Sequence, residues 1–323
     1  MKLVLSHTSA LDFIRAERWR RGELRSTRLR TLADSASSLE EVSSITIPAF
    51  DQTQPQLEVL VSTSDKAQRS KEHICRVLKA PIISGMFCKI AENAYVTSPE
   101  MTFVQMATRL DMIDLILLGM ELCGTYAPCP YADRFDERPA VTNRDRLVEF
   151  CKRATGVRGA ATATRALRWV VDNSNSPAET ALVLFLCLSV RLGGYGFEWP
   201  DMNPETPLGK RASNMLGHPT MRCDLHWVDK HVVMEYDSDQ EHLSSQSASR
   251  DAWRRNVLGY KDVTVITVRK PMIADATAFD DVVRQLAHAL GRRLRPRDME
   301  RTKARADLRI RLFPWVAVGM RNW

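Results

Sequence analysis

Two short stretches of alternating apolar and polar residues follow each other between positions 221 and 237, separated by Asp229 and Lys230. Alternation with a period of two predicts two strands, and their close spacing predicts a β-hairpin. With Asp229 and Lys230 at the centre of the turn, Asp224 lies opposite Glu235. Like charges that face each other across a sheet are destabilising, because their Cβ atoms are only about 4.5–5.5 Å apart. The hairpin therefore needs a group that offsets two facing carboxylates.

The predicted hairpin has one apolar and one charged face, because successive side chains of a strand point in opposite directions. The apolar face consists of Cys223, Leu225, Trp227, Val232, Met234 and Tyr236. The charged face consists of Arg222, Asp224, Glu235 and Asp237. We expect the apolar face to pack in the core and the charged face to carry any chemistry.

Two groups can offset the facing acids. A divalent cation, Mg²⁺ or Mn²⁺, would be held by the hard oxygen ligands of Asp224 and Glu235. Arg222 lies opposite Asp237 in the same register and can neutralise that residue, but this leaves the other two acids facing each other, so the pattern favours the metal. A solvated hairpin with an exposed acidic edge, or with a register shifted by one residue, is the alternative, because the turn lacks an Asn-Gly or Asp-Gly pair.

Positive charge is concentrated in two blocks of the sequence. The chain of 323 residues is long enough for two domains and carries a formal charge of +7. Residues 15–30 contain seven arginines, and residues 292–311 contain nine lysines and arginines. Such blocks are typical of proteins that neutralise nucleic-acid phosphates, and also of solvated helix faces. Together with a carboxylate site, they favour DNA as a partner.

No secretory signal is apparent, and the longest apolar run, residues 181–190, is too short to span a bilayer. We expect a cytoplasmic protein without a membrane partner. The seven cysteines show no paired metal-ligand spacing and are interpreted as core or loop thiols.

The remaining patterns predict an α/β protein, α+β overall. Strands are expected at residues 1–6, 44–49, 56–61, 77–83, 89–96 and 263–268. Helices are expected at residues 11–21, 101–110, 112–123, 144–154, 158–172, 177–190, 248–258 and 275–294. Residues 34–44 read as a loop or short helix, residues 127–144 as a connection between domains, and the stretch before the hairpin as a long loop. From Glu179 onward the order is α, β, β, α, β, α, with a mostly parallel continuation after the hairpin.

This order resembles the PD-(D/E)xK nuclease superfamily and is most similar to its very short patch repair (Vsr) endonuclease branch. The residues that carry the resemblance are Ser176-Pro-Ala-Glu179, Arg222-Cys-Asp-Leu-His-Trp227, Val233-Met-Glu-Tyr-Asp-Ser238, His242, Arg250-Asp251 and Arg254-Arg255. They span roughly residues 174–294. The resemblance implies a restriction-endonuclease-like αβββαβ domain that cuts DNA with Mg²⁺ or Mn²⁺. The expected segments are a mixed N-terminal domain at 1–126, a linker and helical pair at 127–172, the endonuclease-like domain at 173–295 and a basic tail at 296–323.

The resemblance also assigns roles to individual residues. Asp224 and Glu235 are the expected metal ligands, and Glu179 is a further catalytic candidate that a capping box at the start of its helix explains equally well. Asp237 occupies the position of the family's lysine and cannot supply its positive charge. His242, in the loop that follows, is the expected general base in its place, since a neutral imidazole can accept a proton near pH 7.

Basic residues of the same region are the expected DNA contacts. They are Arg222, Arg250, Arg254 and Arg255. Their guanidinium groups would bind the phosphate backbone without reading the base sequence.

Residues 94–107 are similar to a segment of proteins that join an abortive-infection antitoxin-like (AbiEi-like) region to such a nuclease domain. This second resemblance implies a phage-defence or mobile-element context and a toxin or defence component as partner. The alternative function is that of a catalytically inactive nuclease-fold regulator that binds DNA, or of the antitoxin of a toxin–antitoxin system. A third possibility is that the first domain and the basic tail bind a protein while the second domain is a scaffold.

Overall fold

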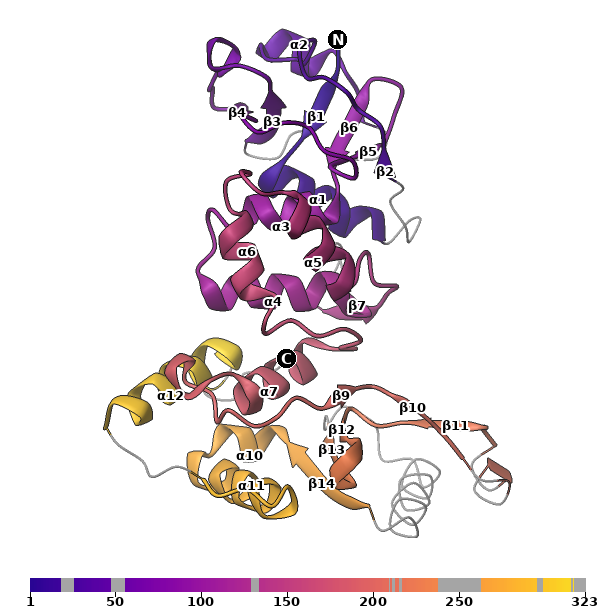
Figure 1. Ribbon diagram of the computed structural model, residues 1–323, viewed down its shortest axis with the longest axis vertical. Coiled ribbons are helices and arrows are strands. Elements are labelled where there is room, and N and C mark those ends of the chain that lie inside the picture. The colour runs from indigo at the N-terminus through magenta and orange to yellow at the C-terminus, as the bar shows by residue number, and fades with distance from the viewer. Residues whose placement is uncertain are drawn as a thin grey trace. The chain divides into compact units, whose positions relative to one another are not determined.

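A computed structural model describes residues 1–18, 26–47, 56–128, 134–208, 210, 213–214, 217–237, 263–294, 299–314 and 316. The chain divides into two compact units, Met1–Asp172 and Asn173–Trp323 (Figure 1). Each unit combines helices with β-sheet, so the protein is of mixed α and β class, as the sequence predicts. In the described part of the chain, no helix is long and apolar enough to cross a membrane.

The first unit is built on a six-stranded mixed sheet with the order β2-β5-β6-β1-β3-β4. Its strands are β1 (Leu3–Leu5), β2 (Ser26–Thr27), β3 (Leu57–Val61), β4 (His73–Val77), β5 (Phe87–Lys89) and β6 (Ala94–Thr97). β1 pairs in parallel with β6 and antiparallel with β3, and β3 pairs in parallel with β4. Every residue of β1 and β3 is buried, as expected for strands at the centre of a sheet that is covered on both faces.

Helices cover this sheet and form a layer beyond it. They are α1 (His7–Arg18), α2 (Leu39–Ser43), α3 (Pro99–Met106), α4 (Met112–Cys123), α5 (Arg144–Arg153) and α6 (Ala160–Ala166). α1 packs against β3, β6 and α3, and α3 packs in turn against α4, α5 and α6 (Figure 1). The short hairpin of β7 (Tyr126–Pro128) and β8 (Phe135–Glu137) follows α4.

Two helix starts follow from the sequence. The Ser98 hydroxyl accepts a hydrogen bond from the Met101 N–H at 3.1 Å, with a proline at the first helical position. The carboxylate of Asp111 caps α4 in the same way, and α4 has the predicted bounds, residues 112–123.

The second unit contains a four-stranded sheet with the order β14-β13-β12-β9 and a ribbon of β10 and β11. Its elements are α7 (Pro177–Cys187), β9 (Asp201–Met202), β10 (Glu205–Pro207), β11 (Thr220–Arg222), β12 (Leu225–Trp227), β13 (Val232–Asp237), β14 (Thr264–Arg269), α10 (Lys270–Ala274), α11 (Ala276–Ala289) and α12 (Met299–Leu312). β9, β12 and β13 are antiparallel neighbours, and β14 pairs with β13 in parallel, as predicted.

Aromatic side chains hold the helices of the second unit together. The ring of Phe185 in α7 stacks on Phe279 of α11 at a centroid distance of 5.2 Å, and it meets Phe313, just after α12, edge to face at 5.9 Å. α12 also approaches Gly193 so closely that a Cβ atom there would lie 2.3 Å from the carbonyl oxygen of Ala304. The basic tail expected after residue 295 therefore contains a helix that belongs to this core.

The predicted hairpin register is confirmed. Leu225 pairs with Met234 and Trp227 pairs with Val232, the pairing counted from the sequence. Asp224 lies one residue before β12, outside this ladder. The connection is a 3₁₀ turn at Val228–Lys230 that ends on a residue in the left-handed region, at φ 54°. The apolar face therefore fixes the register without the Asn-Gly turn that a two-residue hairpin loop prefers.

Several predicted elements differ from the observed ones. Residues 44–47, the described part of the strand expected at 44–49, are not in a strand. The strand expected at 77–83 ends at Val77, near Pro81, which lacks the N–H that a ladder needs. The strand expected at 89–96 is interrupted: residue 89 ends β5, residues 90–93 form a turn, and residues 94–96 belong to β6. The long loop before the hairpin contains β9 and β10. The helix expected at 248–258 lies outside the described residues.

Candidate functional site

Glu179 is held at the first turn of α7 by neutral hydrogen-bond donors. Its own N–H donates to the Ser176 hydroxyl at 3.1 Å, and that hydroxyl donates back to Oε1 at 2.9 Å. The Asn175 N–H donates to Oε2 at 3.0 Å. This is a capping box in which the carboxylate accepts from the residue before the N-cap. Glu179 therefore has the structural role at the start of α7 that the sequence offers for it. The side chain is nevertheless buried, with 8% of its residue surface exposed, which a cap does not require.

Asn203 connects Glu179 to the hairpin. Its side-chain amide donates to Glu179 Oε2 at 2.6 Å and to the Asn173 carbonyl at 2.9 Å, and its backbone N–H donates to the Asp224 carbonyl at 3.0 Å. The residue is buried and left-handed, with φ 50°, a conformation that asparagine tolerates better than most residues. Sequence reasoning missed it because it lies in the predicted long loop. The pair Asn203-Pro204 was the available signal of a turn.

Asp224 replaces a backbone acceptor of the sheet. Its Oδ2 accepts the N–H of Tyr236 at 2.7 Å, just beyond the pair of Leu225 and Met234, where the ladder of β12 and β13 ends. The alternation of side chains also breaks here, since Cys223 packs with Met221 and Val233. Val233 lies on the face of β13 opposite to Met234, so the prediction that Cys223 shares the face of Met234 is wrong. The carboxylate has taken a place in the plane of the sheet, where a regular strand would offer a carbonyl.

Burial and a second acid govern the protonation of Glu179. Burial, and after it the nearby charge of Asp224, raise the pKa of this carboxyl to about 7. The hydrogen bonds from Asn175, Asn203 and Ser176 favour the ionised form and do not outweigh these two effects. Glu179 therefore exchanges its proton near neutral pH, which is the property of a general acid or base.

The two remaining acids of the hairpin lie further along β13. Glu235 is half-buried and lies beside Thr267 in the parallel register of β14. Asp237 forms an ion pair with Arg269, whose Nε is 3.0 Å from Oδ2, and both side chains are largely exposed. Asp237 thus takes Arg269 as a partner, in place of the cross-strand pair expected from the sequence.

Arg269, and not Arg222, is the partner of Asp237. Nε of Arg222 lies 3.8 Å from Oε1 of Glu205 across the ribbon of β10 and β11, outside the ladder of β12 and β13. Arg269 was missed because the predicted strand stopped one residue earlier, at 268. The parallel pairing of β14 with β13 places Arg269 beside Asp237. A positive charge therefore stands next to the position of the family's lysine.

Four predicted site residues lie outside the described residues. They are His242, Arg250, Arg254 and Arg255. Their roles remain those that the sequence predicts.

The donor chemistry of the site suits a hard divalent cation only in part. Among the residues that the structure describes, no group of three or more His, Cys, Asp or Glu side chains is placed to hold a metal ion. Mg²⁺, however, is usually held by one or two carboxylates and fills its other positions with water and substrate phosphate. Asp224 raises the pKa of Glu179, as expected for neighbouring carboxylates. Two neighbouring carboxylates meet this minimum for Mg²⁺, and the described residues form no closed protein cage.

No protein-family profile matches the chain, and no curated protein or solved structure matches it either.

Proposed function

We propose that the second unit is a metal-dependent nuclease that cleaves or nicks DNA. One observation carries the proposal: the pKa of Glu179 is about 7 because a buried carboxyl lies near a second carboxylate, Asp224. Paired acids with a displaced pKa are typical of sites where a proton or a cation is exchanged. The sequence of α7, the antiparallel strands β9, β12 and β13, and the parallel strand β14 supports the same proposal, since the nuclease superfamily has this order.

The three acids have different proposed roles because their surroundings differ. Asp224 and Glu235 would hold Mg²⁺ or Mn²⁺, which activates water and stabilises charge on the scissile phosphate. Glu179 is fixed by Asn203 and Ser176, so its carboxyl keeps one orientation while it takes up or releases a proton. Asn203 also fixes the backbone of Asp224, and it thereby sets the distance between α7 and the hairpin.

Arg269 would supply the positive charge that Asp237 lacks. A guanidinium stays protonated at all ordinary pH values and binds phosphate oxygens through a planar fork, so it can attract a DNA phosphate but cannot act as the base. The base would be Glu179, or His242 as the sequence suggests. Arg222, half-exposed on β11, would contact the DNA backbone.

A second function is favoured by a different observation. Oδ2 of Asp224 already accepts a backbone hydrogen bond, and Asp237 is already paired with Arg269, so both acids have structural partners without a cation. This is the arrangement expected of a nuclease fold that has lost activity and binds DNA as a regulator, or serves as an antitoxin beside a protein partner.

The test is cleavage of supercoiled plasmid and of a mismatched duplex by the purified protein with Mg²⁺ or Mn²⁺. Asp224→Asn keeps an oxygen that can accept the Tyr236 N–H and removes only the charge, so it separates chemistry from folding. Glu235→Gln and Glu179→Gln do the same at the other two positions. We expect nicking by the wild type and a loss of at least about 100-fold in each variant.

Asp281→Asn is the matched control, since it removes an exposed acid from α11 of the same unit. It should cut as the wild type does. Equal activity of all four variants would contradict the nuclease proposal. DNA binding without any cleavage by the wild type would favour the regulator.

A further inference from the structure

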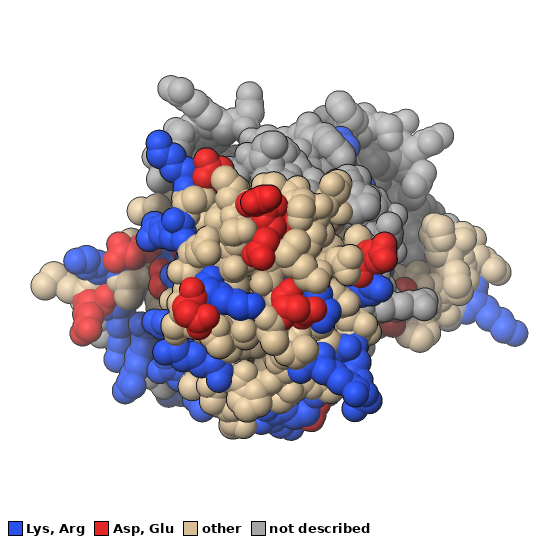
Figure 2. All heavy atoms as spheres, turned by 90° about the horizontal axis from the view of Figure 1, so that it is seen from above, with Lys and Arg blue, Asp and Glu red and all other residues tan. Residues whose placement is uncertain are grey.

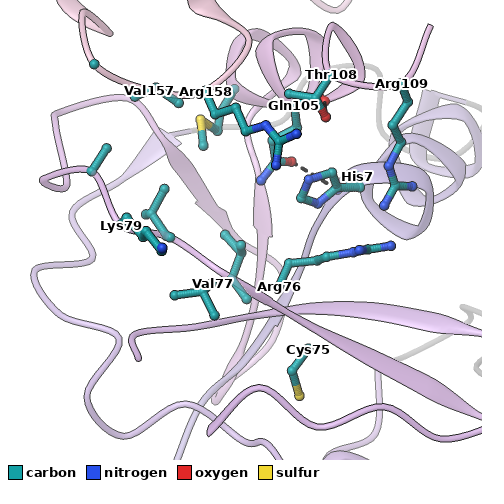
Figure 3. A pocket seen from close by; sticks show the side chains of 15 residues that line it. His7, Cys75, Arg76, Val77, Lys79, Gln105, Thr108, Arg109, Val157 and Arg158 are labelled. Atoms are coloured by element: carbon teal, nitrogen blue, oxygen red, sulfur yellow. Dashed lines mark hydrogen bonds between the residues drawn. The ribbon is translucent and has the colours of Figure 1, made fainter. Parts of the chain in front are cut away.

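The first unit contains a cavity of about 700 Å³ that the nuclease proposal does not use. It lies between the sheet and the helical layer, and five segments line it: the start of α1, β3, the end of β4 with the residues that follow, α3 with the turn after it, and the turn before α6. Figure 3 shows the side chains that point toward it. Its size lies within the range of sites that enclose one small organic molecule.

Four of the lining side chains are cationic. They are Arg76, Lys79, Arg109 and Arg158 (Figure 3). Arg76 and Arg109 both donate to the buried carboxylate of Glu58, with Arg76 Nη2 2.6 Å from Oε1 and Arg109 Nη1 2.6 Å from Oε2. One carboxylate thus serves two guanidinium groups. In the described part of the chain, neither Lys79 nor Arg158 has a carboxylate within ion-pairing distance.

Neutral polar groups lie among these cations. His7 begins α1 in the left-handed region, at φ 49°, and its N–H donates to the side-chain oxygen of Gln105 at 2.9 Å. Figure 3 shows its imidazole near Gln105 and Arg158. Burial, and after it the charge of Arg109, lower the pKa of His7 to about 4, so the ring is neutral at pH 7. A strained residue of this kind, facing a cavity, is more typical of a binding site than of a core.

The rest of the lining is apolar. Leu60, Met101 and Val157 are buried there. A ligand that fills the cavity therefore combines an anionic group with an apolar or flat part.

The side chains that line the cavity include four cations and no acid. On the face seen in Figure 2, acidic and basic side chains are interleaved among the described residues. At the cavity, Glu58 offsets only one of the four cations.

We propose that this cavity binds a phosphomonoester. The phosphate lies among Arg158, Lys79 and Arg109. The organic part lies against Leu60, Met101 and Val157. A phosphomonoester carries nearly two negative charges at neutral pH and three acceptor oxygens, which suits cations that approach from several directions. A free nucleotide and the 5′-phosphate end of a DNA strand both present this group. The site lies entirely in the first unit, so the inference does not depend on the nuclease proposal.

The test is isothermal titration calorimetry of the full chain, without divalent metal, with inorganic phosphate, AMP and adenosine. A second pair of titrations compares one oligonucleotide with and without a 5′-phosphate. If the source is a free molecule, AMP binds and adenosine does not. If the source is a DNA end, AMP stays silent and the phosphorylated strand binds more tightly than the unphosphorylated one. Each of these results supports the site.

Lys79→Ala and Arg158→Ala remove exposed cations that hold no internal ion pair, so the variants should fold normally. Together they should weaken binding about tenfold or more. Lys71→Ala with Arg168→Ala removes the same charge from exposed positions of the first unit outside the cavity and should leave binding unchanged. His7→Asn keeps a residue suited to positive φ and changes only the ring.

Three results would overturn the proposal. They are adenosine that binds as tightly as AMP, the same loss of phosphate binding in the two double variants, and no heat from any phosphate-bearing probe.

Discussion

Glu58 and Glu179 are buried to nearly the same extent, 4% and 8% exposed, and their pKa values move in opposite directions. Burial alone would raise the pKa of Glu58, but hydrogen bonds from Arg109 and Arg76 and from the Thr8 N–H hold it at about 2. Burial raises the pKa of Glu179 to about 7, and its near neighbours are neutral donors and a second acid. The same side chain is thus a fixed anion in one unit and an exchangeable acid in the other.

The comparison shows that partners, more than depth, decide what a buried carboxylate can do. The first unit surrounds its glutamate with guanidinium groups and keeps it permanently charged, which leaves it no proton to exchange. The second unit surrounds its glutamate with amides and a hydroxyl, which leaves negative charge for a proton or a cation to offset.

Glu58→Gln should lower the free energy of unfolding by about 3–4 kcal/mol at pH 7, because two partly buried guanidinium groups lose their counterion and α1 loses an acceptor. Urea unfolding measures it. Glu40→Gln, at an exposed acid of α2, is the control and should change stability little. A loss below about 1 kcal/mol for Glu58→Gln would mean that the ion cluster is not structural.

Glu179→Gln should remove a pH dependence of stability. The folded-state pKa of Glu179 lies above its ordinary value of 4.5, so its protonated form contributes stability that is complete below pH 4.5 and is lost as pH rises through 7. The difference between the wild type and the variant should amount to roughly 3 kcal/mol across this window. Urea midpoints at pH 4.5 and pH 8 measure it.

The contribution of Glu58 to stability changes with pH in the opposite direction. Its folded-state pKa is depressed, so its contribution is present above pH 4.5 and is lost as pH falls toward 2. Parallel curves for wild type and Glu179→Gln between pH 4.5 and pH 8 would refute the comparison.

Divalent cations should stabilise the second unit, and more strongly at pH 8 than at pH 5.5, because a cation at the paired acids competes with the proton on Glu179. At a concentration 100 times the dissociation constant, Mn²⁺ should add about 2.7 kcal/mol. Thermal unfolding with and without Mn²⁺ measures the effect. Asp224→Asn and Glu235→Gln should abolish it, whereas Asp281→Asn should preserve it. A shift of the same size in all these proteins would assign the ion to another site.

The smallest effect is expected at the exposed pair of Arg269 and Asp237. Arg269→Gln should change the free energy of unfolding by less than about 1 kcal/mol, because solvent screens a pair whose side chains are 58% and 42% exposed. DNA binding and cleavage should fall clearly, if the guanidinium serves phosphate as proposed. Arg284→Gln, which breaks the similar exposed pair with Asp281, should change stability as little and leave DNA binding intact. A loss above about 2 kcal/mol in Arg269→Gln would make this pair structural.

Local signals in the sequence predicted much of the fold. The period-two pattern around Asp229 predicted the hairpin and its register, and the caps at Ser98 and Ser176 predicted two helix starts. These features depend on residues close together in the chain. The turn at 90–93 and the short strands β9 and β10 were not predicted, because two or three residues carry too little periodicity to be recognised.

The candidate site was only partly predictable for the same reason. The spacing along the hairpin identified Asp224 and Glu235, since a register can be counted from the sequence. Asn203 and Arg269 reach the site through pairing with distant strands, which cannot be counted in this way. The cluster at Glu58 was missed entirely, because its arginines come from β4 and from the turn after α3.

The hydrogen bond from the Tyr236 N–H to Asp224 has a consequence for the descent of this protein. A substitution that removes the side-chain oxygen at position 224 damages the alignment of β12 and β13, so selection for folding alone preserves an oxygen acceptor there. Asparagine supplies the same acceptor without the negative charge. A lineage that abandons cleavage is therefore expected to keep Asp or Asn at position 224, and a change from Asp to Asn there marks the loss of the chemistry with the fold retained.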